Sequence, residues 1–129
     1  MHAYIAISYA GRKRLKEEME VICSTLVQCG ITPFVFVDQY QFTAEDEKGM
    51  MQKAMEEIDQ SDILIAAASE KAIGIGIEAG YAKGKNKTVI YIRHHNAEHS
   101  TTLSGISDHQ IIYVDLPDLG QKLKRIVDQ

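Results

Sequence analysis

Hydrophobic residues in this chain gather into short continuous runs, and these runs alternate with longer segments of helical periodicity. Apolar, β-branched runs predict buried strands, at Ala3–Ser8, Pro33–Val37, Asp62–Ala68, Thr88–Arg93 and Gln110–Val114. Apolar residues spaced three and four apart predict amphipathic helices, at Arg12–Gln28, Ala44–Gln60, Gly74–Lys83 and Leu116–Val127. Between the last two strands, Arg93–Ser107 has no regular period and is expected to be a long loop or lid.

This order of elements predicts the fold class. Strands that alternate with helices imply right-handed crossovers, and therefore a parallel sheet with helices on both faces. Five such strands predict a doubly wound α/β fold with the flavodoxin-like strand order 2-1-3-4-5. The chain shows no repeat, linker or low-complexity segment, so residues 1–129 are expected to form a single domain.

Ligands of such folds bind beyond the carboxyl ends of the strands, near the switch between the first and third strands. The loops expected at that edge are Ser8–Arg12, Val37–Thr43, Ala68–Gly76 and Arg93–Ser107. The sequence therefore predicts that a functional site draws on residues from these loops.

Composition narrows the range of partners. The net charge of −4 argues against broad electrostatic binding to nucleic acid. No apolar run approaches membrane-spanning length, and the start MHAYIAIS lacks the features of a signal peptide. A cytoplasmic protein without membrane partners is the resulting expectation. Cys23 and Cys29 lie six residues apart on one predicted helix, which turns them to different faces and predicts free thiols.

The glycines of the segment Glu70–Lys85 do not follow a nucleotide-binding fingerprint. Gly74, Gly76 and Gly80 are spaced G-x-G-x-x-x-G, one residue longer than the dinucleotide motif, and they follow the third strand instead of the first. No G-K-[ST] follows them either, as a phosphate-binding P-loop requires. We therefore expect no dinucleotide cofactor, and no cofactor of another kind.

After Glu70, which opens this segment, Glu78 is its one carboxylate, and its neighbours are mostly small residues. Gly74 and Gly76 would let a ligand approach the backbone closely, and a helix start offers free N–H groups to an anion. We expect Glu78 in about the first turn of that helix, where the dipole favours its ionised form. An ionised carboxylate is suited to act as a nucleophile. The alternative is a glutamate that only stabilises its helix.

Other candidate residues lie in and after the first strand. Tyr4 is either a core tyrosine or a phenol that holds a carboxylate in position. Ser8, Gly11 and Arg12 supply a hydroxyl, a small residue and a cation at the start of the first helix, which fits either a phosphate site or a solvated basic helix end. The histidines at 94, 95 and 99 lack the spacing of metal ligands, so no metal site is expected.

Several of these residues together resemble a known family. Tyr4 in the first strand, SDILIA at 61–66 and GIGIEAGYA at 74–82, followed by a basic turn and a TVIYI strand, resemble the nucleoside 2-deoxyribosyltransferase superfamily. The resemblance covers Ala3 to about Val114, and in size and layout the 2′-deoxynucleoside 5′-monophosphate N-hydrolases are nearest.

The resemblance implies a mechanism and an assembly. Glu78 would attack the anomeric carbon of a nucleoside or nucleotide and form a glycosyl-enzyme ester, which water or a second base resolves. Tyr4 would orient Glu78. Ser104, in the segment LSGI, would reach the site of a neighbouring subunit, which implies a homodimer or higher homo-oligomer with shared active sites.

The chain departs from the family pattern at two positions. Where the family has an aspartate that assists base departure, eight residues before Asp62, this chain has Ala54. An alanine cannot donate a proton. Glu57, one turn later, is an alternative acid, but it is expected to face solvent. A hydroxyl that the nucleotide hydrolases place six residues before the nucleophile is replaced by Ala72, which argues against recognition of a monophosphate.

Three functional hypotheses follow. The first is an enzyme that cleaves or transfers at an N-glycosidic bond through Glu78. The second is a nucleotide-binding sensor of the same fold with little or no turnover, which Ala54 favours. The third rests on YIAISYAG at 4–11, which resembles the first box of TIR domains that hydrolyse NAD, although the region around Glu78 lacks their tryptophan-cysteine pair.

Overall fold

Five strands form one parallel sheet in the computed structural model, which describes residues 1–128. The strand order is β2-β1-β3-β4-β5, and every pair of neighbours is parallel, as the sequence predicts. The strands are β1 His2–Ala6, β2 Thr32–Val35, β3 Ile63–Ala67, β4 Thr88–His94 and β5 His109–Tyr113.

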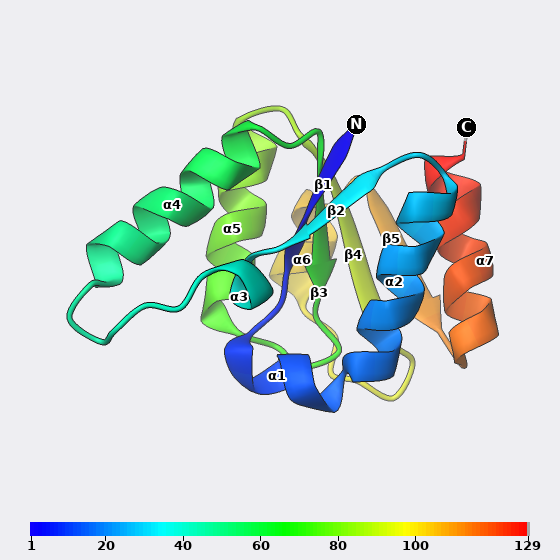
Figure 1. Ribbon diagram of the computed structural model, residues 1–129. Helices are drawn as coiled ribbons and strands as arrows, with labels where there is room; N and C mark the ends of the chain where they lie inside the picture. The colour runs from blue at the N-terminus through cyan, green and yellow to red at the C-terminus, as the bar shows by residue number, and fades with distance from the viewer. Residues whose placement is uncertain (129) are drawn as a thin grey trace.

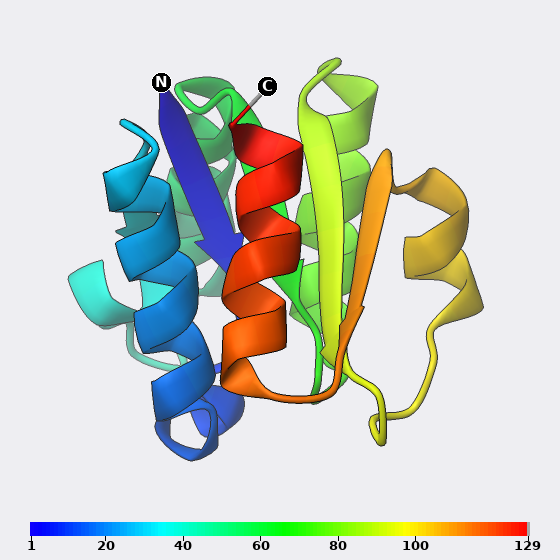
Figure 2. The same cartoon turned by 90° about the vertical axis from the view of Figure 1, so that its right-hand side faces the viewer.

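Helices cover both faces of this sheet (Figure 1). They are α1 Tyr9–Arg14, α2 Lys16–Gln28, α3 Phe36–Gln39, α4 Glu47–Asp59, α5 Ile73–Gly84, α6 Thr101–Ile106 and α7 Leu116–Val127. Figure 2 shows α2 and α7 side by side over one face, with α4 and α5 behind the sheet and α6 beside β5. No helix within residues 1–128 has the length and apolarity needed to cross a membrane.

Alternation along the strands divides the interior into two cores. In β1, Ala3 and Ile5 point to the layer of α2 and α7, whereas Tyr4 and Ala6 point to the layer of α4 and α5. All five residues of β3 are buried, because both faces of this central strand are covered. Tyr4 is therefore placed opposite α5 by the period of two along its strand.

The second strand ends two residues before its predicted end at Val37, and the short helix α3 follows it. Phe36 packs on Tyr40 with ring centroids 5.2 Å apart and also lies 6.1 Å from the ring of Tyr4. Burial of these aromatic rings outweighs the strand propensity of the sequence, which depends strongly on packing. The turn brings Phe36 to the carboxyl edge of the sheet.

The segment Arg93–Ser107 is not an irregular loop, as the sequence suggested, because it contains α6. The hydroxyl of Ser100 caps this helix by accepting a hydrogen bond from the Leu103 backbone nitrogen at 3.2 Å. Two threonines and a glycine weaken the helical signal of the segment. The buried Leu103 supplies the tertiary contact that local propensity lacks.

Helix boundaries also differ from the prediction near the first strand. The helix expected at Arg12–Gln28 begins earlier, after the cap residue Ser8, and is interrupted at Leu15, which separates α1 from α2. The helix expected from Ala44 begins instead at Glu47. Because α1 starts early, Ser8 is its N-cap and lies two residues after the end of β1.

Candidate active site

Tyr4 and Glu78 are 74 residues apart in the sequence and meet in the folded chain. The Tyr4 Oη donates a hydrogen bond to Glu78 Oε2 across the space between β1 and α5. Tyr4 has no exposed surface, and its ring lies 6.0 Å from that of Phe34. The ring of Tyr4 therefore belongs to the core, and its hydroxyl is hydrogen-bonded to a carboxylate.

Burial dominates the electrostatics of this pair. It raises the pKa of Glu78 from 4.5 to about 7, against the hydrogen bond from Tyr4, which lowers the pKa. Burial, followed by the charge of Glu78, raises the pKa of Tyr4, so that the phenol stays a proton donor at neutral pH. Near neutral pH, Glu78 is thus present in both its ionised and its protonated form.

The expected effect of the helix dipole on Glu78 is wrong. Glu78 is the sixth residue of α5, and no acidic residue occupies the first turn of that helix. The dipole acts mainly within the first turn. Desolvation in the interior is the larger influence, and it favours the neutral carboxyl instead of the carboxylate.

Glu78 opens into a pocket of about 210 Å³ at the carboxyl edge of the sheet. The end of β1, helix α3, helix α4 and the start of α5 all contribute to its wall. The lining residues are Ile5, Ile7, Ser8, Tyr9, Phe36, Val37, Met50, Met51, Ala54, Ala72, Gly74, Ile75 and Glu78. This is the position expected for a ligand site in a doubly wound sheet, and the wall is largely apolar.

Two of the other predicted site residues, Ser8 and Gly74, line this pocket with Glu78. Gly11 instead supports the helix cap: its backbone nitrogen donates to Ser8 Oγ at 2.9 Å. A Cβ at Gly11 would lie 2.8 Å from that oxygen, so a larger residue would disturb the cap. Arg12 is bound to Asp38 through Nε–Oδ1 and Nη2–Oδ2 contacts of 2.9 and 3.0 Å, and it does not line the pocket.

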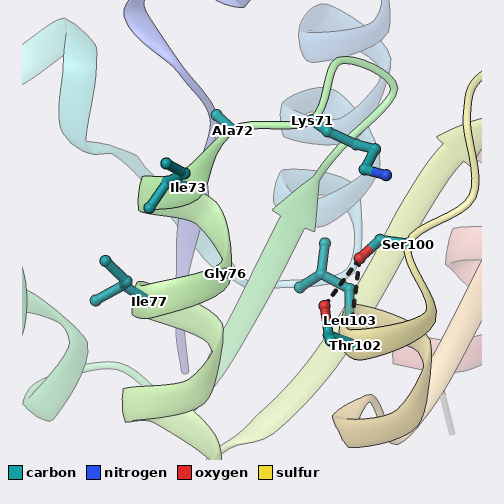
Figure 3. Close-up of a pocket in the computed structure, with 8 residues that line it drawn as sticks. All are labelled: Lys71, Ala72, Ile73, Gly76, Ile77, Ser100, Thr102 and Leu103. Atoms are coloured by element: carbon teal, nitrogen blue, oxygen red, sulfur yellow. Dashed lines mark hydrogen bonds between the residues drawn. The ribbon is translucent and has the colours of Figure 1, made fainter.

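Gly76 lines a second, more open pocket of about 550 Å³ between α5 and α6 (Figure 3). Ala72 belongs to both pockets, so the two lie next to each other across the start of α5. Figure 3 shows Ile73 and Ile77 on one wall, and these side chains are 85% and 55% exposed. Gly76 has no neighbour within 4 Å of the position of an added Cβ, so its small size is not required by packing.

Ser104 lies on α6, and its Oγ approaches Gln110 Oε1 at 3.3 Å. It lines neither of the two pockets beside α5. Within one chain, then, Ser104 is separate from the pair formed by Tyr4 and Glu78.

The residues that the sequence did not single out come mainly from α3 and α4. Phe36, Val37, Met50 and Met51 line the pocket, together with Tyr9 at the start of α1. Val37 lies in a loop expected at the carboxyl edge, and this position was a usable signal. The methionines belong to the apolar face of a helix. The periodicity of such a face does not tell a core residue from a residue of a pocket wall.

The unfavourable burial of Glu78 predicts a pH-dependent gain in stability for Glu78→Gln. A carboxyl with a raised pKa binds protons more strongly in the folded state, so the free energy of unfolding falls as pH rises from 4.5 to about 7. Glutamine does not ionise and escapes this loss, which is at most about 3 kcal/mol.

Thermal unfolding at pH 4.5 and pH 8 measures this effect. Glu78→Gln is expected to exceed the wild type in Tm at pH 8 and to match it at pH 4.5. Glu56→Gln is the control, since its side chain is 54% exposed. Equal Tm differences at both pH values would show that Glu78 has an ordinary pKa.

Comparison with known proteins gives the family of this chain. The family model for nucleoside 2-deoxyribosyltransferase matches residues 3–121, which is most of the chain. This chain belongs to the nucleoside 2-deoxyribosyltransferase family. The family acts on N-glycosidic bonds of nucleosides and nucleotides. Among curated protein sequences, none matches this chain.

Solved structures of similar fold include a CMP N-glycosidase and a 2-deoxyribosyltransferase. The CMP N-glycosidase BcmB of Clostridium botulinum superimposes with a TM-score of 0.72 at 20% identity, over 97% of this chain and 99% of that chain. A conserved protein from Enterococcus faecalis V583 gives 0.76 at 13% identity, over 98% of both chains. A 2-deoxyribosyltransferase from Bacillus psychrosaccharolyticus gives 0.66 at 16% identity, over 95% of this chain and 96% of that chain. At these identities the likeness concerns the fold alone.

Within this deoxyribosyltransferase fold, Ala54 lines the pocket and is 1% exposed. Glu57 does not line the pocket. The sequence predicted that it faces solvent, but its carboxylate has two partners. It accepts a hydrogen bond from Tyr40 Oη at 3.3 Å, and Lys53 Nζ lies 3.4 Å from the same oxygen. Glu57 is therefore held by two partners outside the pocket.

Proposed function

We propose that this protein cleaves or transfers at the N-glycosidic bond of a nucleoside or a nucleoside 5′-monophosphate, with Glu78 as nucleophile. The Glu78 oxygen bonds to the anomeric carbon as the bond to the base breaks, which leaves a glycosyl ester on the enzyme. Water or a second base then displaces the ester.

The observation that carries this proposal is the hydrogen bond from Tyr4 to Glu78 at the wall of the pocket. A nucleophile must be held in an attacking geometry, and a buried tyrosine with a fixed ring restricts the carboxylate. A pKa of about 7 leaves a large ionised fraction at neutral pH and also a carboxylate that is more basic than an exposed one. Both properties support a covalent role.

The second candidate function is a nucleotide-binding module with little turnover. Ala54 favours it, because the residue offers no proton to the departing base from its place in the pocket wall. The apolar wall would still bind a base. This candidate differs from the first in a measurable way, since it predicts binding without release of base.

The test is incubation with a panel of ribonucleosides, deoxyribonucleosides, their 5′-monophosphates and NAD, with released base measured by chromatography. The proposed enzyme releases base from at least one of them. Binding by calorimetry without any release would overturn the enzyme and support the sensor. Release from NAD alone would support the TIR-like hypothesis.

The shared-site proposal gives a prediction for Ser104→Ala. If the hydroxyl reaches the partner's substrate, its loss removes one hydrogen bond and lowers kcat/KM by about 3- to 10-fold. The oligomeric state should not change, because the substitution removes only one hydroxyl oxygen. Steady-state kinetics and analytical ultracentrifugation measure the two quantities.

Ser24→Ala is the matched control for this substitution. Ser24 lies on α2, where its hydroxyl donates a hydrogen bond to the backbone oxygen of Val21 at 3.3 Å. If Ser104→Ala has the same kinetics as Ser24→Ala and the protein is a monomer, the shared active site does not exist.

A further inference from the structure

The pocket beside Glu78 contains no second group suited to protonate a leaving base. Among the lining residues within 1–128, Glu78 is the only carboxylic acid, and no histidine, lysine or arginine lines the pocket. Tyr9 also lines it, but its hydroxyl already donates a hydrogen bond to the Tyr40 backbone oxygen at 3.0 Å. Burial raises the pKa of Tyr9, which makes this phenol a weaker acid still.

The acid is also not supplied by the next turn of α4. Ala54 occupies the turn that faces the pocket, and Glu57 is held by Tyr40 and Lys53 outside it. We place the base against the wall formed by Ala54, Met50 and Phe36, the base-side wall, which is apolar. A base bound there has to depart without receiving a proton from the wall.

This restriction separates two classes of leaving group. A neutral purine or pyrimidine departs as an anion unless it is protonated, and an apolar wall stabilises an anion poorly. A heteroaromatic base that is already cationic at the glycosidic nitrogen or elsewhere in its ring departs as a neutral molecule. General acid catalysis contributes about 10²- to 10⁴-fold where a neutral base must leave, and it is not needed for a cationic one.

The ionisation of Glu78 favours the same class of leaving group, the cationic base. Glu78 is buried, and its ionised form lacks a cationic side chain among the pocket residues within 1–128. A positive ring placed over the carboxylate favours ionisation, whereas a neutral ring desolvates the carboxylate further. A cationic substrate therefore assists both the formation of the nucleophile and the departure of the base.

We propose that the preferred substrates are N-glycosides of a cationic heteroaromatic base, such as an N-alkylated purine or a pyridinium ring. This inference rests on the proposed role of Glu78. The Glu78 oxygen bonds to the anomeric carbon while the C–N bond breaks, and the bonding electron pair passes to the base, which leaves neutral. Water then displaces the ester, the carboxylate is restored, and one proton passes to solvent.

The test compares matched pairs of substrates that differ in charge: 7-methylguanosine with guanosine, and nicotinamide riboside with its 1,4-dihydro form. The wild type should release base only from the cationic member, or faster by about 10³-fold or more in kcat/KM. Because cationic glycosides are also more labile in water, the deciding measurement is how this ratio changes in Ala54→Asp.

Ala54→Asp places a carboxylic acid in the base-side wall. It should raise the rate on guanosine by about 10²-fold or more and change the rate on 7-methylguanosine by less than about 10-fold. Ala54→Asn is the matched control, because it has the same size and polarity without an acidic proton, and it should raise neither rate.

Three results would overturn the inference. One is wild-type turnover of guanosine as fast as that of 7-methylguanosine, and another is an equal rise in the rates on both substrates in Ala54→Asp.

If Ala54→Asp does not fold, a binding measurement decides. The wild type should bind 1-methylnicotinamide at least about 10-fold more tightly than nicotinamide, and Glu78→Gln should bind the two equally. Equal binding of the two by the wild type is the third contrary result. Absence of release from every substrate contradicts the proposed function itself and is distinguishable from all three.

Discussion

Glu78→Gln is expected to lower the rate of base release by roughly 10⁴-fold or more, because loss of a covalent nucleophile costs on that order in other enzymes. Glutamine keeps the size of the side chain and can still accept the hydrogen bond from Tyr4. It has no negative charge with which to form the glycosyl ester. The measurement is single-turnover base release on the substrate that the wild type processes best.

Two further variants separate chemistry from folding at this position. Glu78→Asp keeps the carboxylate but withdraws it by about 1 Å, which is expected to cost about 10²-fold. Glu56→Gln removes an exposed glutamate from α4 and should leave the rate unchanged. Activity of Glu78→Gln close to that of Glu56→Gln would show that another group is the nucleophile.

Tyr4→Phe is expected to lower kcat/KM at pH 7 by about 10- to 100-fold, the usual worth of a hydrogen bond to a charged group. The same bond lowers the pKa of Glu78, so its loss lets burial raise that pKa above about 7. If Glu78 is the nucleophile, as proposed, activity requires its ionised carboxylate. The acid limb of the pH–rate profile should therefore move to higher pH, and the defect should be larger at pH 6 than at pH 9.

The matched control for this substitution is Tyr91→Phe. Tyr91 is also fully buried, and its hydroxyl accepts a hydrogen bond from the Ser100 backbone nitrogen at 3.0 Å. Its loss should reduce stability without moving the pH profile. A profile that shifts equally in both variants would mean that Tyr4 acts only as a core residue.

Much of the fold follows from local patterns. The continuous apolar run at β3 predicts a strand covered on both faces, and the structure buries all its residues. The alternation of strands and helices was enough to predict the parallel sheet and its order. Period-two and period-3.6 patterns are read directly from the sequence because they depend on backbone geometry.

The segments that were predicted wrongly are those stabilised by distant contacts. Phe36 leaves the strand to pack against Tyr40 and Tyr4, and Leu103 stabilises a helix that its own neighbours scarcely favour. In both cases the free energy gained by burying a large side chain exceeds the free-energy difference in local propensity. Sequence windows do not contain the partner that supplies this energy.

Local patterns predict the strand that carries Tyr4, the helix that carries Glu78 and the loops at the carboxyl edge of the sheet. The properties of the Tyr4–Glu78 pair depend on the tertiary fold. The carboxylate was expected to be ionised by a helix dipole, but it lies beyond the first turn and its pKa rises to about 7. The reason is desolvation, which depends on every chain segment packed around the group and not on its neighbours in sequence.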